Sequence, residues 1–500
     1  MARVSFLAVS ILITLFAAFF IFDRTAPSGW THYAFALFII WMVTYLIATI
    51  SYYRTLYLLT TAYVGPLAVF HLTWLVFDVL GEMTTVNVPF GKVADSYFMA
   101  TWYSIVAFGA LGIGMATMML TQRQPLATRD VLVSAKASGS LDWIYRMGVG
   151  LLLASIVFFC MFVAAAGNPL QYSRAEFFET AVGGRGLGAF LMVFPGAVVT
   201  LLIGARKARA RVFAWSLAVF AFAVILISGY RSQAMYPLLV AVVLLSKCGH
   251  RIPISVALSG LAFLLIAIPV VGHIRQQSYE KIDMEVVEKS TEQASVAEGL
   301  ATLGSTLGVL AKSIEVVPAR APFQNGYTYW VAIRDAMPNL SWTMDTSARA
   351  AALGNYAKGT KAIFDLPPGD WMTYIIDPQK FRIGHGVGFS AIAEPYVNFG
   401  FGGIVVFFLV VGLCFAWLDR VDMLRRPWIL LLTSSTLWAL LRTVRNSFGN
   451  FVKPLVFVLV VVAIWWVVLR IFGRNTVPAR HAVVPQNRSL TRATLSGRGK

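Results

Sequence analysis

The chain has 500 residues, of which 58% are hydrophobic and only 13% are charged, and its formal net charge is +18. This composition excludes a soluble globular protein, in which about a quarter of the residues are charged. The positive charge does not indicate a nucleic-acid partner, because it is concentrated in short loops and a tail beside apolar runs, where membrane topology and anionic lipid account for it.

Apolar runs of about 20 residues recur along the chain, and each is close to the length needed to cross a hydrocarbon core of about 30 Å. The first run lacks a convincing small-residue cleavage site, so we expect a retained helix rather than a removed signal peptide. The sequence predicts an all-α polytopic membrane protein with about twelve transmembrane helices, at 5–22, 32–50, 56–80, 97–120, 147–166, 188–205, 212–228, 233–246, 253–272, 400–418, 428–446 and 452–472.

The distribution of Lys and Arg predicts the orientation of these helices. With a cytoplasmic N-terminus, the inside loops and tails hold 22 of the 41 basic residues, the short outside loops hold eight, and the long segment 273–399 holds the other eleven. Because inside loops carry the excess of positive charge, both termini are expected in the cytoplasm. The predicted organisation is nine helices in 1–272, a large outside loop in 273–399, three helices in 400–472, and a disordered basic tail in 473–500.

The long outside loop is expected to be mostly helical. Its 11 basic and 13 acidic residues make it nearly neutral. Helix-forming residues with scattered Glu and Lys predict one or two amphipathic helices ending near Val316, and the stretches at 323–340 and 365–371 predict turns and short helices. A loop of this length is usually functional and packed on the rest of the protein.

No metal or cofactor is expected. The three cysteines, Cys160, Cys248 and Cys414, lie in membrane segments or a cytoplasmic turn, so no disulfide holds the outside loop. Their spacing fits no zinc site, and the sequence has no Asp-x-Asp metal motif.

Seven arginines stand at the expected outer ends of the helices. Arginine has a planar fork that matches phosphate oxygens in bidentate fashion, and a cation at membrane depth usually faces a polar cavity or a partner. These residues therefore predict a site for a phosphate or pyrophosphate, although an interfacial arginine can also simply snorkel to lipid headgroups. They are Arg174, Arg185, Arg231, Arg275, Arg382, Arg442 and Arg445.

Two further positions in the membrane helices carry ionisable groups. His71 and Asp78 are seven residues apart and so share one helix face. We interpret them as a satisfied structural pair or a helix contact rather than as a catalytic site.

The segment "RIGHGVGFSAIAEPYVNFGFGG" at 382–403 combines titratable and flexible residues. Glycines around His385 predict a turn, and Phe389–Phe399 is expected to form a short helix that Asn398 and Gly400 separate from the next membrane helix. His385 and Glu394 are both able to accept a proton from a hydroxyl. Either is a candidate base, and the alternative is that Glu394 only caps the helix.

Three stretches resemble bacterial O-antigen and oligosaccharide repeat-unit polymerases of the Wzy type. They are the run "GVGFSAIAEPYVNFGFGG" at 386–403, which includes Tyr396, the Gly-x-Arg turn in "ILISGYRSQAMYPLLVAVVL" at 225–244, and "NGYTYWVAIRDAMPNL" at 325–340. One departure is visible. Some members carry a glycine eleven residues after an arginine in outside loops, whereas here position 185, eleven after Arg174, is another arginine flanked by glycines.

The resemblance implies an enzyme of the bacterial inner membrane that joins repeat units carried on undecaprenyl pyrophosphate, with the large loop in the periplasm. Glu394 or His385 would be the base, and the arginines together with Tyr396 would hold the lipid-linked substrate. A chain-length regulator and a flippase would be its partners, beside membrane lipid. An O-antigen ligase, or a lipid-linked glycan flippase or transporter, is the alternative function.

Overall fold

The computed structural model describes residues 1–81, 94–121, 139–166, 185–227, 231–250, 252–253, 255, 300, 303–337, 366–382 and 386–472. In this part of the chain 83% of the residues are helical and none lies in a strand. The reason is general: a chain surrounded by lipid has to satisfy its backbone polar groups internally, and a helix does so within one segment. The predicted all-helical class is therefore confirmed.

Eleven of the twelve expected membrane spans overlap a described helix, with ends that differ by at most seven residues, and the twelfth, 253–272, lies outside the described residues except for 253 and 255. Eight of the described helices are long and apolar enough to cross a membrane. α8 and α10 contain shorter apolar stretches. The helices are α1 (Ala2–Asp23), α2 (Trp30–Tyr53), α3 (Leu59–Val79), α4 (Ala94–Thr121), α6 (Ser140–Ala166), α8 (Arg185–Gly204), α9 (Ala208–Ile227), α10 (Arg231–Lys247), α19 (Ala393–Arg420), α20 (Pro427–Arg442) and α21 (Gly449–Phe472).

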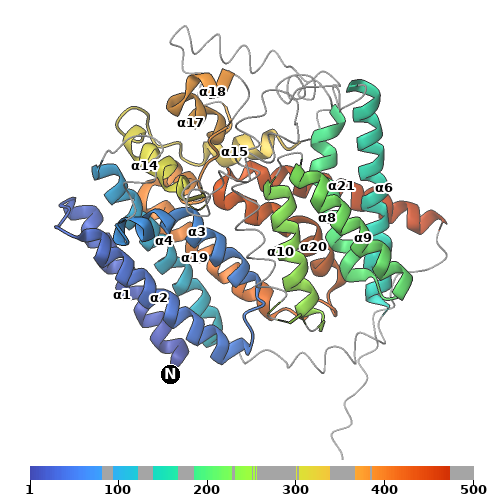
Figure 1. Ribbon diagram of the computed structural model, residues 1–500, viewed down its shortest axis with the longest axis horizontal. Helices are drawn as coiled ribbons and strands as arrows, with labels where there is room; N and C mark the ends of the chain where they lie inside the picture. The colour runs from blue at the N-terminus through green and yellow to red at the C-terminus, as the bar shows by residue number, and fades with distance from the viewer. Residues whose placement is uncertain are drawn as a thin grey trace, which may run out of the picture.

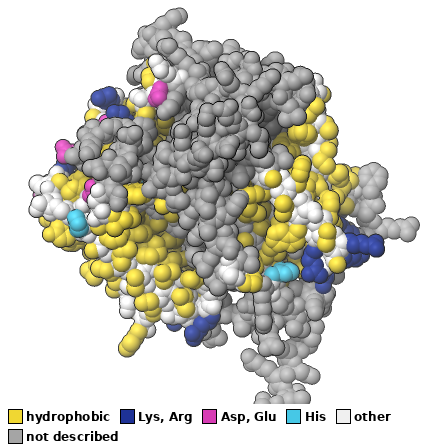
Figure 2. Space-filling view, viewed as in Figure 1, with side chains coloured by type: hydrophobic (Ala, Val, Ile, Leu, Met, Phe, Trp, Pro, Cys, Tyr) yellow, Lys and Arg dark blue, Asp and Glu magenta, His cyan; other side chains and the backbone are white. Residues whose placement is uncertain are grey.

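The outer surface of the helices is apolar. Hydrophobic side chains cover much of the face shown in Figure 2, on both sides of the part that is not described. Large side chains such as Leu12, Phe220 and Ile464 are more than half exposed. An exposed apolar area of this size marks an interaction surface, and in a chain with these helices it is the surface that contacts lipid.

α4 and α19 cross with their backbones in close contact. A Cβ added at Gly412 would lie 2.2 Å from the carbonyl oxygen of Leu111, and one added at Gly114 would lie 2.2 Å from that of Leu409. The two backbones therefore touch, as is typical where small residues let membrane helices approach. Larger residues at either glycine would force α4 and α19 apart.

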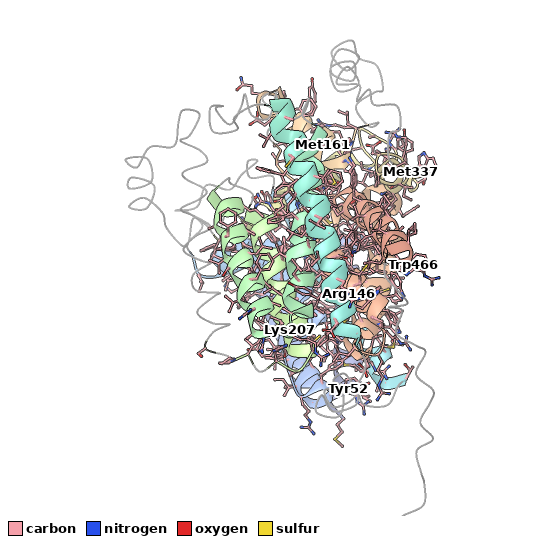
Figure 3. The ribbon with its side chains drawn as sticks, turned by 90° about the vertical axis from the view of Figure 1, so that its right-hand side faces the viewer. Tyr52, Arg146, Met161, Lys207, Met337 and Trp466 are labelled. Carbon is pink, nitrogen blue, oxygen red and sulfur yellow. The ribbon has the colours of Figure 1, made fainter. Side chains whose placement is uncertain are left out.

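The short helices of the predicted loop gather at one end of the bundle. They are α14 (Thr306–Val316), α15 (Tyr327–Arg334), α17 (Pro368–Ile376) and α18 (Pro378–Arg382). Figure 1 shows them together at the end opposite the N-terminus. In Figure 3, Met337 lies near that end with Met161, whereas Tyr52 and Lys207 lie near the other. α14 ends at Val316, as the sequence predicted.

The start of α19 differs from the expected helix. The sequence predicted a helix from Phe389, but α19 begins at Ala393, so that prediction was wrong by four residues. The N–H groups of Phe389 and Ala391 instead donate to the carbonyls of Arg445 and Val444, at 2.9 and 3.3 Å. The predicted break is present, because Gly400 has non-helical angles (φ 64°, ψ −147°) that kink α19.

At the other end of the bundle a buried ion pair joins three helices. The carboxylate of Asp419, at the end of α19, accepts hydrogen bonds from the backbone N–H groups of Leu59 and Thr60, at 2.7 and 3.0 Å, where α3 begins. The Lys247 ammonium, at the end of α10, lies 3.6 Å from Asp419 Oδ1 and donates to the Asp419 carbonyl at 2.6 Å. Asp419 thus satisfies the orphan donors of one helix and a buried cation of another.

Replacing Asp419 by Ala should destabilise the protein by about 3–5 kcal/mol, because it leaves the partly buried Lys247 without its counter-charge and two helix N–H groups without an acceptor. Thermal unfolding of the purified protein in detergent measures the effect. Asp142→Ala is the control, since Asp142 is 61% exposed and pairs with Arg206 at 3.7 Å, and exposed pairs contribute about 0–1 kcal/mol. Equal melting temperatures for the two variants would contradict this role of Asp419.

Candidate functional site

The carboxylate of Glu394 lies buried where three elements meet. Its side chain is in the first turn of α19 and only 3% exposed. One oxygen accepts a hydrogen bond from the Thr328 hydroxyl of α15 at 3.1 Å, and the other accepts from the backbone N–H of Phe448, just before α21, at 2.6 Å. Among the described residues it forms no ion pair. It is therefore a buried carboxylate held by neutral donors.

Asn398, one helical turn after Glu394, completes the network. Its amide nitrogen donates to the Thr328 hydroxyl at 2.7 Å and to the Glu394 carbonyl at 2.8 Å, and its amide oxygen accepts from the Gly326 N–H at 2.9 Å. The Thr328 hydroxyl accepts from Asn398 and so directs its own proton to Glu394. The orientation of the Thr328 O–H is thus set by Asn398.

The kink in α19 explains why α15 lies over Glu394. Because Gly400 interrupts the helix, carbonyls in the preceding turn are available to other donors. The carbonyls of Val397 and Asn398 accept from the N–H groups of Gln324 and Asn325, at 3.0 and 3.1 Å. The segment that donates these hydrogen bonds ends at Gly326, whose φ of +88° lies in the left-handed region that favours glycine. α15 begins at the next residue.

A polar pocket opens beside Thr328. Its volume of about 80 Å³ is smaller than the about 300–1,000 Å³ of typical small-molecule sites, so it takes in one end of a sugar rather than a whole ligand. Its lining brings together hydroxyl, carboxylate, amide and ammonium groups, which suit the hydroxyls of a sugar. The lining residues are Thr328, Val331, Ala332, Asp335, Pro367, Pro368, Ser447, Gly449, Asn450 and Lys453. Thr328 belongs both to this pocket and to the network around Glu394.

Tyr329 adds a hydroxyl near the same carboxylate. Its ring packs on Phe448, with centroids 5.5 Å apart. Its hydroxyl is buried and has no hydrogen-bond partner among the described residues. Burial, reinforced by the negative charge of Glu394, raises the pKa of Tyr329 well above its ordinary value, so the group stays a neutral donor. A buried hydroxyl of this kind is available to a ligand.

Tyr396, which the sequence placed among the substrate-binding residues, has a different set of contacts. Its hydroxyl donates to the carbonyl of Val317 at 2.9 Å, and its ring packs against Tyr103 and Phe323. These contacts join the loop to α19. Substrate binding by Tyr396 remains a prediction beside this structural role.

Arg442 and Arg445 lie at the end of α20 and in the following turn, η4 (Thr443–Arg445). With the Gln233 amide oriented so that its oxygen accepts, that oxygen receives hydrogen bonds from both terminal nitrogens of Arg442, at 3.1 and 3.2 Å. The Arg445 guanidinium lies 5.7 Å from the centre of the Phe70 ring. The guanidinium groups of Arg442 and Arg445 both interact electrostatically with the buried Tyr236 hydroxyl. Two arginines and a phenol thus lie close together.

The structure describes only the backbone of three other predicted arginines. Arg231 begins α10, two residues before Gln233, so its backbone lies beside the end of α20 that carries Arg442. Arg185 begins α8 and Arg382 ends α18. The remaining candidates, Arg174, Arg275 and His385, lie outside the described residues.

His71 in α3 forms hydrogen bonds both within its own helix and with the turn that precedes α19. Its Nδ1 donates to the Leu67 carbonyl at 3.0 Å, so its Nε2 accepts from the Ser390 hydroxyl at 2.8 Å. Ser390 Oγ in turn accepts from the N–H groups of Ile392 and Ala393, at 3.1 and 3.2 Å. The interpretation of His71 as a helix contact is confirmed, and the contact fixes the turn that precedes Glu394.

Sequence reasoning missed several of these residues as site candidates. Asn398 had a detectable signal, because it lies four residues after Glu394 and so on the same helix face. Gln233 also had one, as a polar residue at the start of an apolar helix. Thr328 and Tyr329 lie in the stretch 325–340 that resembles the family, but nothing local assigned either one to the site, since only the fold brings α15 over α19.

The described part of the chain contains no group of three or more His, Cys, Asp or Glu that could hold a metal ion. All three cysteines are free thiols, and only Cys248 is buried.

The fold and the site define a multi-pass helical membrane protein. Its buried carboxylate, polar pocket and arginine pair lie at the end of the bundle where α14, α15, α17 and α18 gather. The family model for the O-antigen polysaccharide polymerase Wzy matches residues 4–475, and the chain belongs to this family. Its role is thus in polysaccharide biosynthesis at a membrane, as the resemblance indicated. Comparison with curated proteins and with solved structures gave no match.

Proposed function

We propose that this protein polymerises oligosaccharide repeat units carried on undecaprenyl pyrophosphate, at the periplasmic face of the bacterial inner membrane. The observation that supports it is the site itself: a buried carboxylate reaches a polar pocket through Thr328, and arginines stand at helix ends nearby. Family membership supplies the class of reaction. The product would be O-antigen or a related surface polysaccharide.

One end of the acceptor sugar would occupy the pocket beside Thr328. A hydroxyl oxygen of this sugar attacks the anomeric carbon of the growing chain, while its proton passes to Thr328 Oγ and the Thr328 proton passes to Glu394. This relay explains how a carboxylate that is 3% exposed could act as the base, since Thr328 already donates to it. The sequence left two candidate bases, and His385 remains the alternative. A positioned base contributes about 10²–10⁴-fold to a rate.

The bond that breaks joins the anomeric carbon to the lipid pyrophosphate, which leaves with the electron pair. Negative charge develops on the leaving oxygen, and cations fixed before the reaction stabilise it without reorganisation. Arg442 and Arg445 are the described candidates, and Arg231 begins the neighbouring helix. Arg174, Arg185, Arg275 and Arg382 remain proposed members of the same site.

Orientation and partners follow from this chemistry. A lipid-linked donor presented outside the cytoplasm requires the α14–α18 end to face the periplasm, with both termini in the cytoplasm. The opposite end carries Lys207 (Figure 3) and the two arginines, Arg425 and Arg426, that precede α20. Cytoplasmic loops of membrane proteins carry an excess of such positive charge. A flippase that delivers the substrate and a chain-length regulator are the expected partners.

A deletion strain tests the proposed function. Its lipopolysaccharide should carry single-repeat caps, because units are still made, flipped and ligated but not joined, and the wild-type gene should restore long chains. Absence of any cap on lipid A would instead indicate an O-antigen ligase or a flippase. An unchanged ladder would show that the protein has no part in the pathway.

A further inference from the structure

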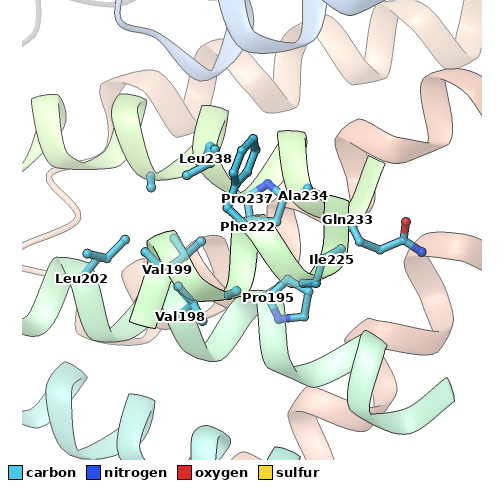
Figure 4. Close-up of a pocket in the computed structure, with 13 residues that line it drawn as sticks. Pro195, Val198, Val199, Leu202, Phe222, Ile225, Gln233, Ala234, Pro237 and Leu238 are labelled. Atoms are coloured by element: carbon cyan, nitrogen blue, oxygen red, sulfur yellow. The ribbon is translucent and has the colours of Figure 1, made fainter. Parts of the chain in front are cut away.

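Apolar side chains between the membrane helices leave little free space. Between α8, α9 and α10, residues that include Pro195, Phe222 and Leu238 line a space of about 20 Å³, which is enough for one water molecule (Figure 4). A lipid chain has no room there, so lipid contacts the protein on its exposed apolar faces. One such face belongs to a short helix of the predicted loop, α15.

The two faces of α15 differ. On one face Thr328, Val331 and Ala332 are buried against the rest of the protein. On the opposite face Trp330 and Ile333 are 58% and 45% exposed, at the three-residue spacing that places side chains on one side of a helix. The mechanism proposed above uses the buried face, which carries Thr328, and gives no role to the exposed apolar face.

The exposed apolar face continues past the last residue of α15. Met337 is 65% exposed, and its N–H donates to the Arg334 carbonyl at 3.2 Å, so a helical turn follows the helix. Met337 is seven residues after Trp330 and four after Ile333, which places the three on the same side. They form the outer face of α15. Arg334, whose side chain is 48% exposed, lies at the edge of this face.

The buried face of α15 packs on a membrane span. Ala332 forms a small hydrophobic cluster with Val452, and Val456 packs against that cluster. A Cβ added at Gly449 would lie 3.5 Å from that of Ala332. All three partners belong to the first two turns of the span Gly449–Ile471 in α21. α15 therefore lies against the end of a helix that crosses the membrane.

Exposed apolar residues of the membrane helices adjoin the outer face. Phe399, in the membrane span of α19, is 53% exposed, and its ring would lie 3.3 Å from a Cβ added at Gly326, immediately before α15. In Figure 3, Met337 lies on the same side of the molecule as Trp466 of α21, and near the level of Met161, the last residue of the apolar span in α6. The outer face thus continues the lipid-facing surface of the bundle.

We infer that the outer face of α15 is immersed in the lipid leaflet at the α14–α18 end of the bundle, so that α15 is an interfacial helix anchored in the membrane. Its composition suits that position. Tryptophan is enriched at the level of the lipid headgroups, and an interfacial helix buries its apolar face about 5–10 Å deep. Arg334 stands at the edge, where a long cationic side chain reaches lipid phosphates. Continuity with the membrane spans favours lipid over a protein partner.

This contact gives the bilayer an influence on the reaction. Thr328 lies on the other side of the same short helix and donates to Glu394 at 3.1 Å. A change in the depth or tilt of α15 therefore moves the Thr328 hydroxyl relative to the Glu394 carboxylate. The lipid contact itself does not depend on the proposed function, whereas its effect on the rate rests on that function.

Fluorescence quenching in liposomes tests the lipid contact. In the full-length protein the two exposed cysteines, Cys160 and Cys414, are first replaced by alanine. Bimane is then attached at Ile333→Cys or Met337→Cys on the outer face, and at Asp335→Cys, which lines the polar pocket, as the control. Phospholipids with a nitroxide near the start of an acyl chain should quench the two outer-face labels, and aqueous iodide should quench only the control.

The contrary outcomes are distinct. Iodide quenching at all three positions would overturn the inference, because the outer face would then be in water. Outer-face labels that lipid nitroxide does not quench in liposomes, but that native membranes protect from iodide, would overturn it in favour of a protein partner. Lipid quenching at both positions, in a protein whose wild type makes no polymer, would uphold the anchor and overturn the proposed function.

A second measurement requires no substitution and serves if the cysteine variants do not fold. A phospholipid with a photoactivatable diazirine near its headgroup is supplied to the wild type in liposomes, and adducts are located by peptide mapping. Labelling within 327–337 is expected from the contact of the outer face with lipid. Labelling that spares this stretch would overturn the inference.

The influence on the reaction is tested by Ile333→Glu. A charge among acyl chains is costly, so this variant should lift α15 from the leaflet and shorten the surface polysaccharide made in the deletion strain. Ile333→Leu is the matched control, because it keeps an apolar side chain, and should give the normal length. Equal polymer length from the two variants would remove the coupling between the bilayer and Thr328.

Discussion

Glu394→Gln should abolish polymer while the protein still accumulates in the membrane at its normal level. The substitution removes the proton acceptor but keeps the shape of the side chain. The glutamine oxygen can still accept from the Phe448 N–H, and its amide nitrogen can donate to Thr328 Oγ, whose hydroxyl has acceptor capacity to spare. The length distribution of surface polysaccharide, with the variant expressed in the deletion strain, measures the effect.

Thr328 tests the route of the proton. Thr328→Ser keeps the hydroxyl and should retain activity, whereas Thr328→Val keeps the volume, removes the relay and should lower the rate by about 10²-fold or more, on the scale of a positioned acid–base group. The structure makes the pair informative, because Asn398 holds this hydroxyl toward Glu394. Equal activity of the two variants would remove Thr328 from the mechanism.

A purely structural role for Glu394 gives a different pattern. Glu394→Ala would leave the buried Phe448 N–H without its acceptor and cost about 1–3 kcal/mol of stability, whereas the glutamine variant would polymerise normally. His385→Ala belongs in the same series. Normal polymer from Glu394→Gln together with none from His385→Ala would move the base to His385, and activity in both would place the base elsewhere.

The class of the fold could be predicted because membrane helices leave a direct signal in the sequence. Runs such as 5–22 and 452–472 are apolar over about the length of a bilayer core, and that signal depends on no distant contact. The break at Gly400 was predictable as well, since glycine and the polar Asn398 interrupt an apolar run. The expected start of α19 at Phe389 failed because the hydrogen bonds that the N–H groups of Phe389 and Ala391 donate to the carbonyls of Arg445 and Val444 depend on the fold.

Only part of the candidate site could be predicted. Glu394 was found because a carboxylate beside a membrane helix is unusual in its local sequence. Thr328 and Tyr329 were not, because a hydroxyl in a short amphipathic helix carries no local sign of its partner 66 residues away. Gln233 stands out as a polar residue at the start of an apolar helix, but its partner Arg442 could not be predicted, because that contact depends on the packing of α10 against α20.

Arg442→Lys should lower the polymerisation rate nearly as much as Arg442→Ala. Both terminal nitrogens of Arg442 are already oriented by Gln233, and the planar fork can present two parallel donors to a phosphate, which an ammonium cannot. Loss of one preorganised donor at a developing negative charge costs about 2–4 kcal/mol, or roughly 10²–10³ in rate. Release of lipid pyrophosphate by membranes supplied with lipid-linked repeat units measures it.

The lysine variant separates this role from snorkelling. An arginine that only reaches lipid headgroups uses its charge and its aliphatic stem, and lysine provides both. Full activity of Arg442→Lys beside an inactive Arg442→Ala would therefore indicate a headgroup contact and remove Arg442 from the pyrophosphate site. Arg425→Lys is the control, because Arg425 lies just before the opposite end of α20 with its side chain 62% exposed. Under the proposed mechanism the leaving group does not approach that end, so the activity of this variant should equal that of the wild type.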